Sequence, residues 1–221
     1  MGGAKSETPV ESGVVQDQKI ETPKEPATSD VIYAGLDIGT MNLVLARSDA
    51  PDIKMIRNVF LPVKEDEISI SDLSDISYVQ SGDGNIYIIG EDAFRFANIF
   101  SKEVSRPMEK GLISPKEINA IDVLTMMIKS LFGDDIKDKE IYCSYSIPAQ
   151  SIDEGRSVTY HEKVFGKILS TLGISHKPVN EAAAIIYSEC AKEKFSGIGV
   201  SFGAGMTNTV LCFKGVEAAK F

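Results

Sequence analysis

The sequence predicts an α/β domain built around a mixed β-sheet. Short apolar runs occur in pairs around glycine-containing turns, as they do in β-hairpins. Longer segments repeat their apolar residues at helical spacing, and strands alternate with helices along the chain. With 221 residues, of which 43% are hydrophobic and 25% are charged, the chain is long enough for one large domain or two small ones.

The first half of the chain is predicted to begin with two β-hairpins and one strand between them. Apolar residues alternate on both sides of the turn 37–41, which reads Asp-Ile-Gly-Thr-Met. A second turn, 81–85, reads Ser-Gly-Asp-Gly-Asn and has the composition of a hairpin turn. The predicted strands are 31–36 and 42–46, then 53–60, then 76–80 and 86–89.

Three helices are predicted in the second half. Ser114 is a predicted N-cap, Pro115 occupies the first helical position, and Glu117 completes a capping box. Apolar residues follow at helical spacing up to Leu131, and Gly133 is expected to end this helix. The other predicted helices are 158–172 and 181–194, and the remaining predicted strands are 140–147, 198–202 and 207–213.

Residues 1–30 differ in composition from the rest of the chain. They contain no leucine and no aromatic residue, and they carry three prolines and six acidic residues. Such a segment buries too little apolar surface to order itself, so we expect a disordered tail. Gly2 and Ser6 fit a short myristoylation pattern, which is the only basis on which a membrane partner is expected.

The overall charge and the cysteines exclude several classes of function. A formal net charge of −9 argues against a nucleic-acid partner, since phosphate backbones are held by an excess of Lys and Arg. Cys143, Cys190 and Cys212 stand in apolar surroundings without the spacing of a zinc site, which favours reduced core thiols. No apolar run approaches the roughly 20 residues of a membrane span, so a cytoplasmic location is expected.

Two glycine-containing turns have the features of a phosphate-binding site. A phosphate chain needs several backbone N–H donors that side chains do not obstruct, and glycines meet this need. Gly39 stands in the first turn, and Gly203 and Gly205 stand in the turn 203–206. Thr40 and Thr207 add hydroxyl groups beside these glycines.

Two acidic residues are candidates for the chemistry of such a site. Asp37 precedes the first turn, and a carboxylate in this place could hold Mg²⁺ through water, because magnesium prefers oxygen ligands and retains part of its hydration shell. Glu181 stands at the start of a predicted helix and could orient or activate an attacking water. Taken alone, either residue could also have a purely structural role, Glu181 as an ordinary helix cap.

Five motifs in order resemble the actin-like ATPase superfamily, which includes actins, bacterial MreB and the seventy-kilodalton heat-shock chaperones. The resemblance covers residues 31–221. Residues 35–40, Gly-Leu-Asp-Ile-Gly-Thr, match the first phosphate motif, and 203–207 match the Gly-x-Gly-x-Thr of the second. The other three motifs are Gly90-Glu-Asp-Ala with 106–113, which is similar to MreB; Ile147-Pro-Ala149 with Arg156, which is similar to the chaperones; and Asn180-Glu-Ala-Ala-Ala-Ile.

The resemblance implies the N-terminal lobe of a two-lobed, ribonuclease H-like fold with a mixed five-stranded sheet flanked by helices. Residues 31–196 would form the first lobe and 197–221 the start of a truncated second lobe, in a protein that binds ATP with Mg²⁺ and self-associates into filaments. Glu181 and Asp37 would be catalytic, and Asp37 with Ser201 would hold the metal. The nucleotide would contact Gly39, Thr40, Met41, Asn42, Gly203, Ala204, Gly205, Met206 and Thr207.

The chain departs from the family pattern at two places. Ser201 stands where the family carries a metal-positioning aspartate, and a hydroxyl does not replace the charge of a carboxylate. Either hydrolysis is impaired while phosphate binding survives, or Asp37 and Glu181 suffice for the metal. The second departure is length, since the adenosine pocket of the family lies in a second lobe. We expect a fragment of a longer product, because the strand 207–213 would otherwise leave an unpaired sheet edge.

Three functions are therefore compatible with the sequence. A filament-forming cytoskeletal ATPase is favoured by the MreB-like segment 90–113. A chaperone-type ATPase is favoured by Pro148 with Arg156, and a non-hydrolysing nucleotide-binding scaffold is favoured by Ser201. The sequence leaves the activity of an ATPase open, and it does not identify the base or the cargo.

Overall fold

The computed structural model describes residues 31–64, 67–68, 73–150 and 158–221. The tail predicted at 1–30, with its myristoylation pattern, lies outside the described residues, and so does Arg156. No helix in the described part of the chain is long and apolar enough to cross a lipid bilayer.

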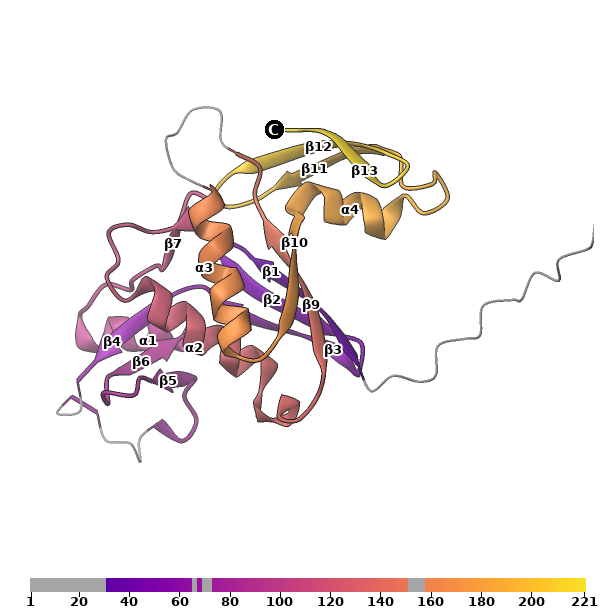
Figure 1. Cartoon of the computed structure of the whole chain (residues 1–221). Coiled ribbons are helices and arrows are strands. Elements are labelled where there is room, and N and C mark those ends of the chain that lie inside the picture. The colour runs from indigo at the N-terminus through magenta and orange to yellow at the C-terminus, as the bar shows by residue number, and fades with distance from the viewer. Residues whose placement is uncertain (1–30, 65–66, 69–72, 151–157) are drawn as a thin grey trace, which may run out of the picture.

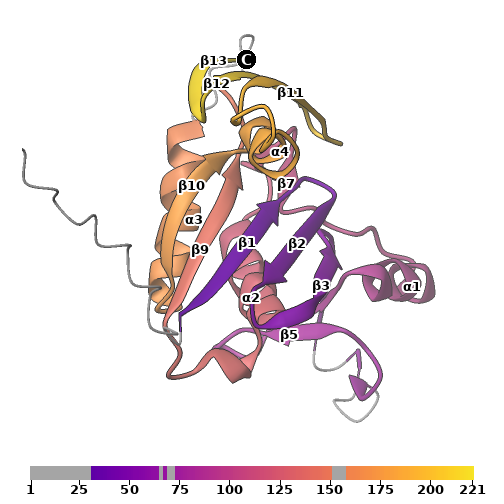
Figure 2. The ribbon, with the colours of Figure 1, turned by 90° about the vertical axis from the view of Figure 1, so that its right-hand side faces the viewer.

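A five-stranded mixed sheet forms the centre of the molecule, as predicted (Figure 2). Two neighbouring pairs, β1 with β9 and β9 with β10, are parallel, whereas β2 runs antiparallel to both of its neighbours, β1 and β3. The parallel pairing aligns the ends of β1 and β9 at the same edge of the sheet. In spatial order the strands are β10 (Ser175–Asn180), β9 (Ile141–Ile147), β1 (Ile32–Ile38), β2 (Asn42–Arg47) and β3 (Ala50–Arg57).

Two helices, α2 (Ala120–Phe132) and α3 (Val158–Thr171), cover one face of this sheet (Figures 1 and 2). Along β1 the residues alternate strictly between buried and exposed, because successive side chains of a strand point to opposite faces. The buried set packs against both helices in the main core. The other face is open, and it exposes apolar side chains such as Tyr33, Ile53 and Met55.

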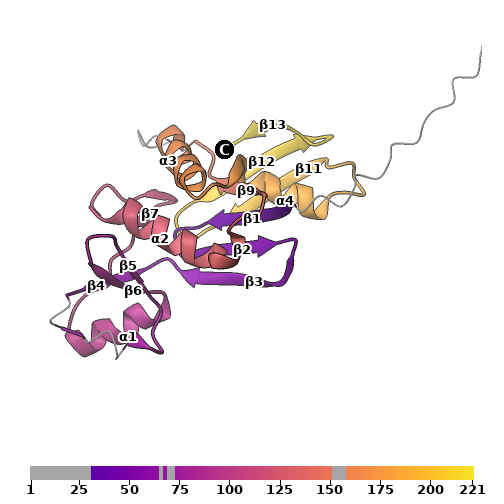
Figure 3. The same cartoon turned by 60° about the horizontal axis from the view of Figure 1, so that its bottom comes forward.

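A smaller three-stranded sheet lies beside the main one (Figure 3). It consists of β4 (Phe60–Val63), β6 (Ile86–Ile89) and β5 (Tyr78–Gln80), and α1 (Glu91–Phe100) packs on it in a second apolar cluster. The prediction of one strand over 53–60 is wrong, since the chain leaves the main sheet after Arg57. Asn58 and Val59 then turn it into the smaller sheet.

A short hairpin precedes α2. Its strands are β7 (Met108–Glu109) and β8 (Leu112–Ile113), and its two turn residues, Lys110 and Gly111, have positive φ angles of 53° and 76°. Positive φ at both central residues is the geometry of a tight hairpin turn of type I′.

The predicted helix start, with Ser114 as N-cap and Pro115 as the first helical residue, is wrong, because α2 begins five residues later at Ala120. The Ser114 hydroxyl accepts a long hydrogen bond, 3.4 Å, from the N–H of Lys116, and Asn119 is the N-cap. Ile118 is 95% exposed, so the segment before α2 has no apolar face to pack. The predicted end at Gly133 is confirmed, and a short 3₁₀ turn, Asp134–Ile136, follows it.

The last three strands form a separate antiparallel sheet at the top of Figure 1: β11 (Gly197–Phe202), β12 (Thr207–Phe213) and β13 (Val216–Lys220). Because β12 is the central strand, the expectation that it leaves an unpaired edge is wrong. Strand β13, which pairs with β12, was not predicted from the sequence.

Helix α4 (Glu181–Glu189) lies between the main sheet and this last sheet (Figure 1). Asn180 caps it, since its side-chain oxygen accepts from the N–H groups of Ala182 and Ala183. The helix is shorter than the predicted 181–194. Lys194 and Phe195 have positive φ angles, which a helix cannot contain, and the chain turns there into β11.

The close packing of α4 on β11 depends on a glycine. A Cβ at Gly199 would collide with the backbone carbonyl oxygen of Ala182 and lie 3.1 Å from the Ile186 side chain. We therefore expect Gly199→Ala to reduce the free energy of unfolding by about 1–3 kcal/mol, as overpacking does. Chemical denaturation would measure this loss. Gly35→Ala is the matched control, because a Cβ there meets nothing within 4 Å, and equal effects of the two substitutions would contradict the packing argument.

Candidate functional site

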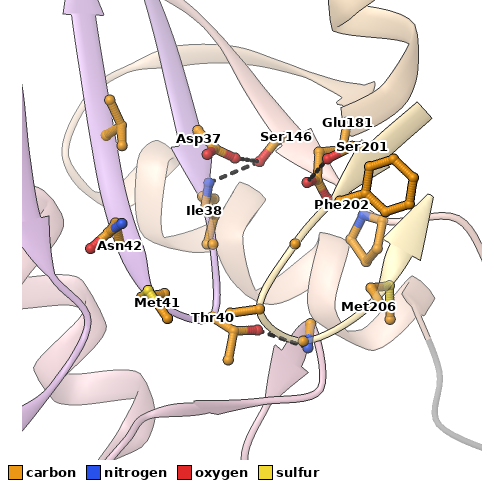
Figure 4. Close-up of a pocket in the computed structure, with 17 residues that line it drawn as sticks. Asp37, Ile38, Thr40, Met41, Asn42, Ser146, Glu181, Ser201, Phe202 and Met206 are labelled. Atoms are coloured by element: carbon orange, nitrogen blue, oxygen red, sulfur yellow. Dashed lines mark hydrogen bonds between the residues drawn. The ribbon is translucent and has the colours of Figure 1, made fainter. Parts of the chain in front are cut away.

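A cleft of about 570 Å³ opens where the main sheet meets the last sheet (Figure 4). Three segments surround it: the β1–β2 turn, the β11–β12 turn and the start of α4. The residues that line it are Asp37, Ile38, Gly39, Thr40, Met41, Asn42, Val44, Gly111, Ser146, Pro148, Glu181, Ser201, Phe202, Gly203, Ala204, Gly205 and Met206. Every residue predicted for the site lines this cleft except Thr207, which is exposed on β12 opposite Phe202.

The first turn is closed by a hydrogen bond from the N–H of Gly39 to the carbonyl of Asn42, at 3.0 Å. A Cβ at Gly39 would lie 2.8 Å from that carbonyl oxygen, so only glycine fits without a shift. Among the described residues, the N–H groups of Thr40 and Met41 meet no hydrogen-bond acceptor. The turn therefore has two backbone donors available for an anion.

The second turn is closed in the same way, by the N–H of Gly203 and the carbonyl of Met206 at 2.9 Å. Within the described chain, no acceptor meets the N–H groups of Ala204, Gly205 and Met206. The two turns together thus line one cleft with five backbone donors that the described protein does not use.

The two turns also touch each other and the β7–β8 hairpin. Thr40 Oγ1 accepts a hydrogen bond of 2.8 Å from the N–H of Gly111 (Figure 4), and Met206 lies against Gly111. A Cβ at Gly205 would collide with Gly111 N and with Thr40 Oγ1. Gly205 is therefore required for the contact between the turns. The sequence analysis did not place Gly111 in the site, because only the fold brings this hairpin to the cleft.

Asp37 is held by Ser146, the second residue that sequence reasoning missed. Ser146 Oγ donates to Asp37 Oδ1 at 2.8 Å and accepts from the N–H of Ile38 at 2.8 Å (Figure 4). Ser146 is near the end of β9, and the parallel pairing of β1 with β9 sets it beside Asp37. No described group donates to the second carboxylate oxygen of Asp37, which leaves that oxygen available to a ligand.

Glu181 accepts hydrogen bonds on both carboxylate oxygens. Ser201 Oγ donates to Oε1 at 2.5 Å, and Asn208 Nδ2 donates to Oε2 at 2.8 Å. Burial raises the pKa of Glu181 above its ordinary value, the hydrogen bond from Ser201 opposes this increase, and the nearby charge of Asp37 adds to it. The carboxylate is thus fixed in position and its basicity is increased.

Asn208 is a further residue that the sequence did not single out. Its side chain is fully buried, and its Oδ1 accepts from the N–H of Ala149 at 2.7 Å while its Nδ2 donates to Glu181. The amide thereby joins β12, the segment after β9 and the start of α4. Asn208 directly follows the second glycine motif, and its amide oxygen and nitrogen are both hydrogen-bonded. The sequence could not indicate this role, because the hydrogen-bond partners are remote in sequence.

The described residues fit a magnesium ion that is held mainly by water and phosphate. Among them, no cluster of three or more His, Cys, Asp or Glu side chains could enclose a metal. Mg²⁺ is usually bound through one or two carboxylates together with water and substrate phosphates. Asp37 has a carboxylate oxygen available for this role. Ser201 gives its proton to Glu181, so only its oxygen lone pairs remain for a water or an ion.

A family model described as Volactin matches residues 32–221. No protein among curated sequences matches the chain.

Solved structures of actin-like proteins share its fold. MamK in its double helical filament aligns with a TM-score of 0.57 and 18% identity over 82% of this chain and 50% of MamK. MreB5 of Spiroplasma citri bound to AMPPNP aligns with a TM-score of 0.59 and 12% identity over 89% and 52%. ParM of pSK41 without nucleotide gives a TM-score of 0.57 and 14% identity over 87% and 66%. The chain spans about half the length of MamK and MreB5, and its fold is that of the actin-like ATPase superfamily.

The hydrogen bond from Ser201 opposes the effect of burial on Glu181. Removing it in Ser201→Ala should therefore raise the pKa of Glu181 further, because the ionised form loses a donor. Carboxyl NMR titration of both proteins would measure the two pKa values. Ser196→Ala is a suitable control, since Ser196 bonds only backbone groups outside the cleft. An unchanged or lower pKa in Ser201→Ala would contradict the contact.

Proposed function

Because this chain belongs to the Volactin family and has the actin-like fold, we propose that it is a cytoplasmic, filament-forming cytoskeletal protein that binds ATP with Mg²⁺. The observation that carries the proposal is the pair of glycine turns, which line one cleft and have five backbone N–H groups without an acceptor among the described residues. Oriented backbone donors of this kind bind phosphate without any basic side chain.

Magnesium dependence follows from the charges of the cleft. Asp37 and Glu181 line it, and no Lys or Arg is among its described lining residues. A triphosphate would meet two carboxylates and no compensating side-chain cation. A bound Mg²⁺ would neutralise part of the phosphate charge, with Asp37 as its protein contact and Ser201 near its water shell.

Hydrolysis would use Glu181. Its carboxylate is held by Ser201 and Asn208, and its raised pKa makes it a better acceptor of a proton from an attacking water. Asp37 would assist through the metal. The nucleotide phosphates would contact the turn residues named above, Thr40 and Met41 in the first turn and Ala204, Gly205 and Met206 in the second.

The filament part of the proposal is supported by the similar structures. MamK is described as a double helical filament, and AlfA from the B. subtilis plasmid pLS32, with a TM-score of 0.50, is also described as a filament. We propose further that 31–196 form a first lobe and that β11–β13, within 197–221, begin a second one, which packs against α4 of the first.

A non-hydrolysing scaffold is the second candidate, and a specific contact favours it. Ser201 stands where the actin-like ATPases that the sequence resembles carry a metal-positioning aspartate, and it donates to Glu181. A site in which this carboxylate is replaced by a hydroxyl could retain phosphate binding and lose turnover, since loss of such a group can reduce the rate by roughly a thousandfold.

Binding and assembly can be tested on one sample. We expect calorimetry to show saturable ATP binding with Mg²⁺, and we expect sedimentation to show a pellet that depends on Mg-ATP. Asp37→Ala should weaken binding by about tenfold or more, because the metal loses its protein carboxylate. Asp52→Ala, at an exposed position on β3, is the control. Absence of binding by the unmodified chain would refute the nucleotide part, and binding without a pellet would refute the filament part.

Ser201→Asp tests whether the missing carboxylate limits hydrolysis. If it does, the substitution should raise Mg-dependent phosphate release, up to about a thousandfold. Without Mg²⁺ the variant should be less stable than the parent, since the new carboxylate faces Glu181 in place of a donor. Ser201→Asn is the control, because asparagine has nearly the shape of aspartate and lacks its charge. No gain over Ser201→Asn would mean that Asp37 and Glu181 suffice for the metal.

A further inference from the structure

Asn58 lies directly behind the first glycine turn, and neither the sequence motifs nor the lining of the cleft include it. Asn58 is fully buried and lies where the chain passes from β3 to β4. Asn58 Nδ2 donates to the carbonyl of Gly39 at 2.9 Å, and its backbone N–H donates to the carbonyl of Met41 at 2.8 Å. One residue thus binds two carbonyl groups of the turn.

These contacts determine which way the peptide group between Gly39 and Thr40 faces. In a planar trans peptide the carbonyl and the following N–H point in opposite directions. Because the Gly39 carbonyl points back to buried Asn58, the N–H of Thr40 points away from Asn58, and Thr40 lines the cleft whereas Asn58 does not. That N–H has no acceptor among the described residues.

The turn would not hold this orientation by itself. Gly39 has no Cβ, so the peptide that follows it can rotate with little steric cost. If the peptide turned over, the cleft would present a carbonyl oxygen to a phosphate in place of a donor. The Asn58 amide opposes this rotation, because turning the carbonyl away would leave the buried Nδ2 donor of Asn58 without its acceptor, which is costly.

We propose that Asn58 is a positioning residue for phosphate binding, which acts by holding the Gly39–Thr40 peptide with its N–H toward the cleft. This inference rests on the proposed function, since it names the group that orients one of the phosphate donors. Asn58 itself does not contact the ligand.

The test compares Asn58→Leu with the parent chain. Leucine keeps the approximate volume of the side chain and removes the donor. The affinity for Mg-ATP and for magnesium tripolyphosphate should fall about tenfold, and to the same extent for both, because the lost contact concerns phosphate and not the base. A loss for Mg-ATP alone, or no loss, would overturn the proposal.

Val59→Ala controls for stability. Val59 is the next residue and is fully buried, but its side chain belongs to the second apolar cluster. This variant should lose stability to denaturant and keep the parent affinity for both ligands. If Val59→Ala lost affinity as Asn58→Leu does, the effect would follow stability and the positioning role would be refuted.

Two further measurements do not require the affinities of the variants to be compared. A crystal structure of ligand-free Asn58→Leu should show the Gly39 carbonyl turned toward the cleft, and an unchanged peptide would overturn the inference. In the parent chain, magnesium tripolyphosphate should shift the NMR resonance of the Thr40 amide. If the parent chain bound neither ligand, the proposed function would fail, while the crystal structure would still decide the role of Asn58.

Discussion

The carboxylate of Glu181 connects the two sheets that form the cleft, and the geometry of the site depends on this connection. Glu181 begins α4, which follows the last strand of the main sheet, whereas its donors Ser201 and Asn208 belong to the last sheet. Asn208 is fully buried and also binds the backbone after β9. Buried polar groups require partners, so these bonds hold the second glycine turn opposite the first.

The environment of Glu181 also determines the chemistry of its carboxylate. A carboxylate that accepts on both oxygens is confined to one orientation, and burial raises its pKa. Ser201 supports the orientation of Glu181 but brings no negative charge for a metal. In the proposed function, phosphate binding would not need a charge at Ser201, whereas hydrolysis would depend on Asp37 and Glu181.

Much of the fold was predictable because its signals are local. Alternating apolar residues predicted the hairpin of β1 and β2, and Gly133 correctly predicted the end of α2. The start of α2 was missed since Ser114 and Pro115 carry capping signals in a segment whose apolar residue, Ile118, is exposed. The pairing of β13 with β12 was missed because its residues lack a strong alternating pattern.

The sequence by itself determined the two glycine turns and the two acidic residues, because the steric freedom of glycine and the charge of a carboxylate belong to the residues themselves. Only the tertiary structure decided what holds them. Ser146 reaches Asp37 through parallel strand pairing, Gly111 reaches Thr40 through a remote hairpin, and Asn58 reaches Gly39 from the connection between β3 and β4. Such contacts join residues far apart in sequence, and a hydrogen bond between them exists only once the backbone has folded.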